Sequence, residues 1–144
     1  YLLKYTAYDA LVNGSAVCQG FAVLFYRLSL ELGVDARYIR GYASNGVNHG
    51  WNIVALNGKY YNLDATWDED NFPNFRYFLR CNLYFPDHSR RAEYDSTAFN
   101  SAYPMAATDF PYEAAANAVK ITSQPKNVTV AEGADISHHN IGQL

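Results

Sequence analysis

The sequence predicts an α+β fold in which one helix packs on a small antiparallel sheet. Apolar residues recur at steps of three and four from Val17 to Leu32, and Gly33 follows where a left-handed residue ends many helices. Asn57-Gly58 is typical of a two-residue hairpin turn between strands. Short segments rich in β-branched and aromatic residues flank this turn or precede it, and we expect strands at 36–43, 49–56 and 59–65.

The remaining elements are predicted from shorter patterns. Residues 1–12 have the composition of a short helix that ends near Asn13-Gly14. Ser15 is a favourable N-cap for the second helix, which would place Cys18 at the third helical position. A further strand is expected at 75–79, whereas the chain after Pro86 is polar and irregular and predicts no regular element.

The size and composition indicate one folded domain followed by a tail. The chain has 144 residues, of which 49% are hydrophobic and 17% charged. We place a domain at 1–117, and 118–144 as a linker and the start of a truncated domain. The tail contains the stretch ITSQPKNVTVAEGADI, which resembles the opening strands of immunoglobulin-like repeats on bacterial surface proteins. The resemblance implies an extracellular or cell-surface location, and the start at Tyr1 suggests a piece of a longer protein.

Charge and residue spacing argue against several classes of partner. The net charge of −3 offers no basic stripe for nucleic acid, and no apolar run reaches the length that membrane insertion needs. Two cysteines without a C-x-x-C pair do not suggest a structural zinc site. Asp68, Glu69 and Asp70 are adjacent and lack the spaced ligands of a calcium loop. We therefore expect neither a cofactor nor a metal requirement.

Cys18 is the first candidate functional residue. The N-terminus of a helix stabilises an anion, so a cysteine there is a candidate thiolate nucleophile. Two structural interpretations remain open at this point. Cys18 is a small apolar core residue, or it forms a disulfide with Cys81.

The predicted hairpin supplies partners for a nucleophile. A turn at 57 and 58 sets Trp51 opposite Asp64, so that His49 lies diagonally across from Asp64 on the same face. Asp64 would then orient the His49 ring, and the other ring nitrogen would face Cys18. Alternatively, His49 is a surface residue and Asp64 caps the following turn. The other histidines are weaker candidates, because they lie in an irregular stretch or in the tail: His88, His138 and His139.

Three sequence blocks resemble the transglutaminase-like superfamily, within the papain-like cysteine enzymes. They are AVCQGFAVLF, NHGWN and YYNLDATWDED, and the resemblance covers residues 1 to about 90. It implies a papain/transglutaminase-like fold with catalytic Cys18, His49 and Asp64. Gln19 and Gly20 after the cysteine are similar to the bacterial transglutaminase-like and peptidase-like branch.

These residues together suggest cysteine-dependent acyl transfer or hydrolysis through a thioester, on protein or cell-wall peptide amides. We expect the Cys18 backbone N–H to be one oxyanion donor, and Tyr5 or Tyr8 is a candidate for the second. Trp51 is expected to shield the histidine, and Trp67 to pack beneath the turn. The alternative function is a non-catalytic adhesion or scaffold module of a surface protein. The oligomeric state is left open.

Overall fold

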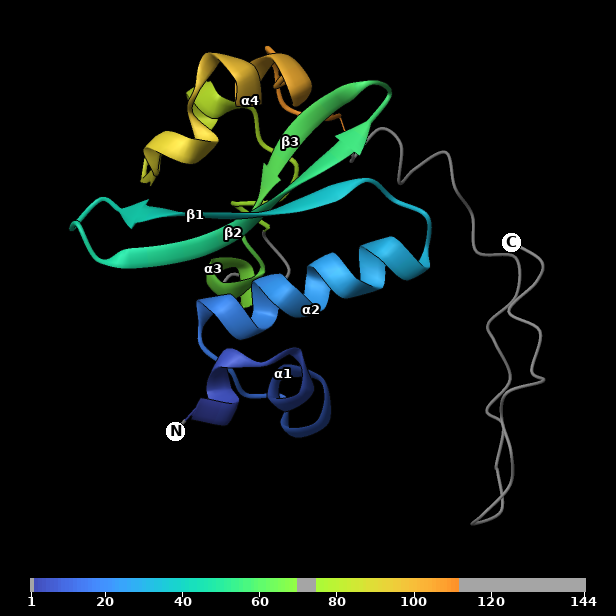
Figure 1. Ribbon diagram of the computed structural model, residues 1–144, viewed down its shortest axis with the longest axis vertical. Coiled ribbons are helices and arrows are strands. Elements are labelled where there is room, and N and C mark those ends of the chain that lie inside the picture. The colour runs from blue at the N-terminus through green and yellow to red at the C-terminus, as the bar shows by residue number, and fades with distance from the viewer. Residues whose placement is uncertain (1, 70–74, 112–144) are drawn as a thin grey trace. The chain divides into compact units, whose positions relative to one another are not determined.

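A four-stranded antiparallel sheet is the centre of the molecule. The structure is a computed structural model that describes residues 2–69 and 75–111. The strand order is β3-β2-β1-β4, and the strands span Ala36–Ala43 (β1), Asn48–Leu56 (β2), Lys59–Leu63 (β3) and His88–Arg90 (β4). Helix α2, Cys18–Glu31, packs against β1 and β2, as Figure 1 shows. The predicted α+β fold is confirmed.

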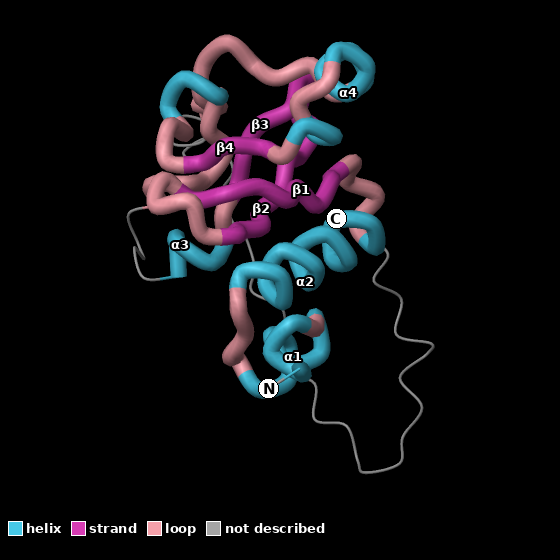
Figure 2. Tube along the Cα trace, turned by 60° about the vertical axis from the view of Figure 1, so that its left-hand side comes forward, coloured by secondary structure: helices cyan, strands magenta, loops and turns pink. Residues whose placement is uncertain are grey.

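Short helices surround this core. They are the 3₁₀ helix η1 (Leu2–Tyr5), α1 (Ala7–Asn13), α3 (Ala65–Glu69), η2 (Asn82–Tyr84), η3 (Ala92–Tyr94) and α4 (Thr97–Ala102). Helix α1 packs on α2 on the side away from the sheet (Figure 2). Both views place α4 across the sheet from α2.

The turns follow the glycine and asparagine signals of the sequence. Gly14 and Gly33 adopt left-handed φ angles of 60° and 70° after α1 and α2. Asn57 and Gly58, at φ 52° and 76°, form the turn between β2 and β3. The strand register pairs Ile53 with Asn62, as a two-residue turn requires. The predicted C-terminal ends of the two helices and the register of the hairpin are therefore confirmed.

The start of α2 differs from the prediction. Its N-cap is Val17, which supplies no side-chain capping bond, and Cys18 is the first helical residue instead of the third. Ser15 is used elsewhere, because its hydroxyl accepts a hydrogen bond of 3.2 Å from Lys4 Nζ. The Val17 N–H donates to the Lys4 carbonyl at 2.9 Å, and this bond holds the chain extended up to the helix.

The strand expected at 75–79 is wrong. The chain here makes only separate contacts with β3 and the residue after it: the Asp64 N–H donates to the Tyr77 carbonyl at 3.0 Å, and Asn62 forms an isolated bridge with Arg80. Leu79 lies at φ 53°, a left-handed conformation that interrupts a regular strand. Strand β3 also ends at Leu63, because helix α3 begins at Ala65.

Strand β4 is an element that the sequence analysis missed. It pairs Gly41 with Arg90 and Ala43 with His88, in the stretch that we expected to be irregular. A side chain on Gly41 would collide with the Ser89 carbonyl and with the Trp51 ring, so the close approach of β4 to β1 requires glycine here. The main hydrophobic core consists of Ile39, Trp51, Ile53, Tyr60, Tyr77 and Phe85.

Some predictions concern residues outside the described ranges. They include the boundary between 117 and 118, the immunoglobulin-like segment, and the residues His138 and His139. The cell-surface location depends on that same segment and stays a prediction. Within 2–69 and 75–111, none of the helices is long and apolar enough to cross a membrane.

Candidate active site

Cys18 opens onto a cleft at the start of α2. The thiol is free and partly exposed, and the cleft has a volume of about 470 Å³. Cys81 is also free and is fully buried, so the alternative of a Cys18–Cys81 disulfide is wrong. The ten residues that line the cleft come from η1, the start of α2, the sheet and the segment after β4: Tyr5, Val17, Cys18, Gln19, Tyr38, Arg40, Asn48, His49, Gly50 and Arg91.

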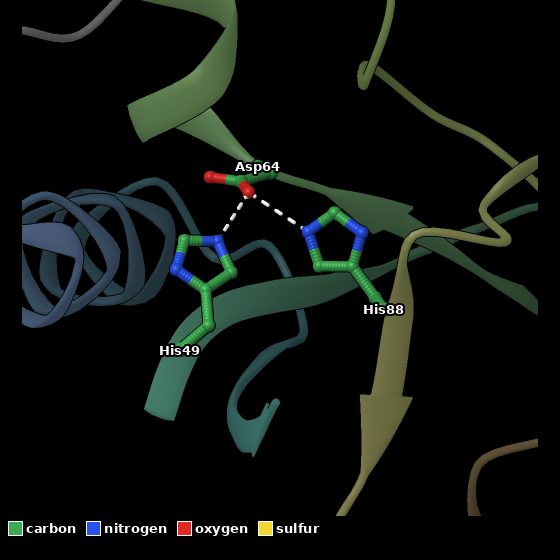
Figure 3. Close-up of side chains that lie close together, drawn as sticks. All are labelled: His49, Asp64 and His88. Atoms are coloured by element: carbon green, nitrogen blue, oxygen red, sulfur yellow. Dashed lines mark hydrogen bonds and ion pairs between the residues drawn. The ribbon is translucent and has the colours of Figure 1, made fainter. Parts of the chain in front are cut away.

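His49, near the start of β2, links the cysteine to the carboxylate. Its Nε2 lies 2.6 Å from Asp64 Oδ2, and the two side chains are 7% and 0% exposed. Figure 3 shows the second ring nitrogen, Nδ1, on the far side of the ring from Asp64. Cys18 and His49 line the same cleft, and the interaction with His49 is the main cause that lowers the pKa of the thiol. The structure thus brings Cys18, His49 and Asp64 together.

Asp64 divides its two oxygens between two tasks. Oδ1 accepts the backbone N–H groups of Thr66 at 3.0 Å and Trp67 at 3.3 Å, and so caps helix α3. Oδ2 accepts from the histidines. The capping role and the orienting role, which we treated as alternatives, are therefore both present in one side chain.

His88 is a site residue that the sequence analysis set aside. From β4 its Nε2 reaches Asp64 Oδ2 at 2.9 Å, so one oxygen serves two imidazoles (Figure 3). The side chain is 0% exposed, and the ring stacks on Phe85 with centroids 3.8 Å apart. Its position depends on β4 pairing with β1, and no local pattern around residue 88 signals that pairing.

The pKa values of the two histidines are shifted in opposite directions. Burial lowers the pKa of His88 and outweighs the attraction of Asp64. His88 is therefore neutral, with its proton on Nε2, and its Nδ1 is buried without a hydrogen-bond partner. Burial also opposes the charged form of His49, but the hydrogen bonds to Asp64 and Cys18 prevail and raise its pKa to about 9.

The pKa of Cys18 is shifted in the direction opposite to that of His49. The hydrogen bond from His49 lowers the pKa of the Cys18 thiol, against desolvation, and the backbone N–H groups of Gly50 and Gln19 add to the effect. Asp64 itself is buried, but its bonds to both histidines keep its pKa below the ordinary value. The lowered pKa of Cys18 and the raised pKa of His49 both favour the pair of a thiolate and an imidazolium over the neutral pair.

Aromatic rings enclose the His49–Asp64 contact. Trp67 stacks on His49 with centroids 4.8 Å apart and planes inclined by 22°, whereas Trp51 lies farther away, at 6.2 Å. We expected Trp51 to be the shield and Trp67 to pack beneath the turn. Both tryptophans shield the ring, and Trp67 is the nearer one. Trp51 is held by its indole N–H, which donates to Asn62 Oδ1 at 3.3 Å.

The two tyrosines proposed as oxyanion donors occupy different environments. Tyr5 lines the cleft beside Cys18. Tyr8 is 62% exposed and does not line this cleft, so it is not placed for the role. Tyr38 is a further cleft residue that the sequence analysis did not consider.

The cluster of His49, Asp64 and His88 has the residue types of a metal site. One ligand atom from each side chain lies within 4.8 Å of the others. The Nε2 atoms of both histidines already bond to Asp64 Oδ2, however. A metal ion here would take the same atoms, so metal binding and the orientation of His49 by Asp64 exclude each other.

Part of the chain matches a known protein family. Residues 2–65 match the Transglutaminase-like superfamily. The match covers Cys18, His49 and Asp64. The family resemblance inferred from the three sequence blocks is confirmed over this segment, whereas the catalytic role of each residue stays a prediction.

Two curated relatives and one solved structure are similar over part of the chain. Kyphoscoliosis peptidase from Homo sapiens and that from Mus musculus are each 30% identical over 94 residues. The aligned region is 56% of this chain and 14% of each relative, so the chain spans a small part of these proteins. A crystal structure of a TGase is 27% identical and covers 46% of this chain and 18% of that one, with a TM-score of 0.43.

Proposed function

We propose that this chain carries the active site of a cysteine-dependent enzyme that transfers or hydrolyses acyl groups from amides through a thioester. The observation that carries the proposal is the position of Cys18 at the first residue of α2, where His49 bonds its thiol and Asp64 holds the opposite ring nitrogen. A binding module has no need for this alignment of three buried or half-buried polar groups.

The proposed reaction begins with the Cys18 thiolate. Its sulfur attacks the amide carbonyl, and the electron pair of the C=O bond moves to oxygen. We expect the backbone N–H of Cys18, the first residue of α2, to donate to that oxyanion. The imidazolium of His49 then gives its Nδ1 proton to the departing amine as the C–N bond breaks, which leaves a thioester.

The second half restores the enzyme. Water or a second amine attacks the thioester, His49 Nδ1 takes the proton of the attacking group, and the thiolate leaves as the new bond forms. Asp64 keeps the ring in place and stabilises the imidazolium of each half-reaction. The attacking group decides between hydrolysis and crosslinking. A polypeptide or a cell-wall peptide is the substrate class that we propose.

The first experiment measures the rate of iodoacetamide alkylation of Cys18 against pH. Mass spectrometry of peptides separates Cys18 from buried Cys81, which is an internal control. We expect an apparent pKa of the Cys18 thiol below about 7.5, and a higher one in His49→Ala. A slow thiol with an ordinary pKa in both proteins would contradict the proposal and favour the adhesion or scaffold alternative.

A further inference from the structure

The cleft beside Cys18 is basic although the chain as a whole is acidic. The net charge of the chain is −3, yet the cleft lining includes two arginines and no aspartate or glutamate. The arginines, Arg40 and Arg91, come from β1 and from the residue after β4. Their charges act on any substrate that approaches the thiol, so the environment of each one matters.

Arg40 is already neutralised by the protein. Its Nη2 pairs with Glu93 Oε1 at 3.2 Å, and its Nε donates to the hydroxyl of Tyr94 at 3.1 Å. The carboxylate cancels most of the field that this guanidinium would place in the cleft. Arg40 therefore contributes little net attraction for an anion.

Arg91 has no such partner among the residues that the structure describes. Its Nη2 donates to the neutral amide of Asn48 at 2.7 Å, and no carboxylate of residues 2–69 or 75–111 forms an ion pair with it. Its Nε is buried and has no acceptor. A guanidinium has five N–H donors, so this side chain has unused donors and an uncompensated charge.

The surroundings also fix the orientation of Arg91. The guanidinium carbon lies 5.6 Å from the centroid of the Tyr42 ring, and the Arg91 backbone N–H donates to the Arg40 carbonyl at 3.1 Å. A side chain held in this way loses little entropy when it binds an anion, and a planar guanidinium fits a carboxylate with two parallel hydrogen bonds.

We propose that Arg91 binds a carboxylate of the acyl substrate, and that the site selects acidic peptides. The inference rests on the proposed function, because it assumes that Cys18 is the nucleophile of this cleft. The carboxylate belongs to an Asp or Glu side chain of the substrate or to its free C-terminus. Both sources offer the same planar group to the guanidinium.

The test compares two alkylating reagents of similar size and different charge. Iodoacetate is an anion and iodoacetamide is neutral, so the ratio of their rates at Cys18 reports the field in the cleft and cancels changes in thiol reactivity. In Arg91→Gln we expect the iodoacetate-to-iodoacetamide ratio to fall roughly three- to tenfold, and 0.5 M NaCl to reduce the difference between the two proteins.

The matched control removes the neutralised pair. The double variant Arg40→Gln/Glu93→Gln deletes one positive and one negative charge, and we expect the ratio to change by less than about twofold. An unchanged ratio in Arg91→Gln, or an equal fall in the control, would overturn the proposal. If Cys18 reacts slowly with both reagents at every pH, the proposed function itself fails, and this outcome is distinct from an unchanged ratio.

Protection experiments distinguish the two sources of carboxylate. N-acetylglutamic acid amide carries a side-chain carboxylate, N-acetylglycine carries a terminal one, and N-acetylglutamine amide is neutral. Stronger protection of Cys18 by either acid, lost in Arg91→Gln, supports the proposal and identifies the source. Equal protection by the neutral compound contradicts it.

Discussion

At the scale of single residues, Asp64 links the candidate site to the local fold. One oxygen caps α3 and the other bonds His49 and His88. A buried carboxylate without donors is costly, and this one has four: two backbone N–H groups and two imidazoles. The neutral His88 is a positioning residue, because it fixes the carboxylate that in turn fixes His49.

The substitution His88→Phe tests this positioning role. Phenylalanine keeps the stacking on Phe85 but removes the second donor to Asp64 Oδ2. We expect the free energy of unfolding to fall by about 1–3 kcal/mol, as for a lost bond to a buried charged group. The measurement is urea unfolding.

A second readout of His88→Phe separates positioning from packing. With one donor fewer, Asp64 becomes more basic and holds the proton of His49 more strongly. The alkaline limb of the pH–rate profile should therefore move upward, which a packing defect alone does not cause. An unmoved limb at reduced stability would contradict the positioning role.

The shifted pKa values predict how activity and stability depend on pH. Activity needs thiolate and imidazolium together, so it should rise through the lowered pKa of Cys18 and fall as pH passes about 9, where His49 loses its proton. The folded His49 titrates at about 9 and the unfolded one near 6.5, so its stabilising contribution is complete below 6.5 and is lost as pH rises through 9.

Two titrations check this pair of expectations. The pH–rate profile gives the rise of activity at low pH and its fall at high pH. Urea unfolding between pH 6 and 10 gives the free energy of unfolding. In His49→Ala the loss of stability over that pH range should become smaller, because the group with the raised pKa is gone. If stability falls with pH equally in His49→Ala and in the unchanged protein, other titrating groups cause the fall.

At the scale of elements, β2 and β3 present the site and β4 completes it. The hairpin could be predicted because Asn57-Gly58 fixes the turn type, and the turn fixes which residues face each other. Strand β4 could not be predicted, because its three polar residues show no alternation of apolar and polar side chains and its pairing with β1 is long-range. The sequence therefore predicted His49 and Asp64 together but missed His88.

The substitution Gly41→Ala should separate β4 from β1. A methyl group at this position meets the Ser89 carbonyl and the Trp51 ring, so the strands must move apart and His88 with them. We expect a loss of more than about 2 kcal/mol in stability, as in overpacked sites, together with lower activity. Thermal unfolding and the rate of Cys18 alkylation measure both effects.

Gly46→Ala is the matched control for this substitution. Gly46 has φ +78°, and nothing lies within 4 Å of an added methyl group. Its replacement should cost about 1 kcal/mol through backbone strain alone and leave the reactivity of Cys18 unchanged. Equal losses in the two variants would show that contact with β4 is not the cause at Gly41.

At the scale of the whole molecule, the two cysteines report different events. Cys18 is open to the cleft, whereas Cys81 is fully buried, and its backbone N–H donates to Asp109 Oδ1 at 2.8 Å. A reagent reaches Cys18 in the native state, but it reaches Cys81 only when the fold around it opens. One chain thus carries a probe of the site and a probe of unfolding.

We predict that urea removes the difference in reactivity between the two thiols. Without urea, alkylation of Cys81 should be slower than that of Cys18 by a factor on the order of 10³ or more, set by the stability of the fold. Above the unfolding midpoint the rate at Cys81 should rise to that of an ordinary thiol. Alkylation of Cys18 should slow down at neutral pH, because unfolding removes His49 and the helix terminus that lower its pKa.

Coincident midpoints for the two changes would mean that the activated thiol and the buried core form one cooperative unit. A loss of Cys18 reactivity well below the midpoint for Cys81 would instead show that the site opens before the rest of the fold.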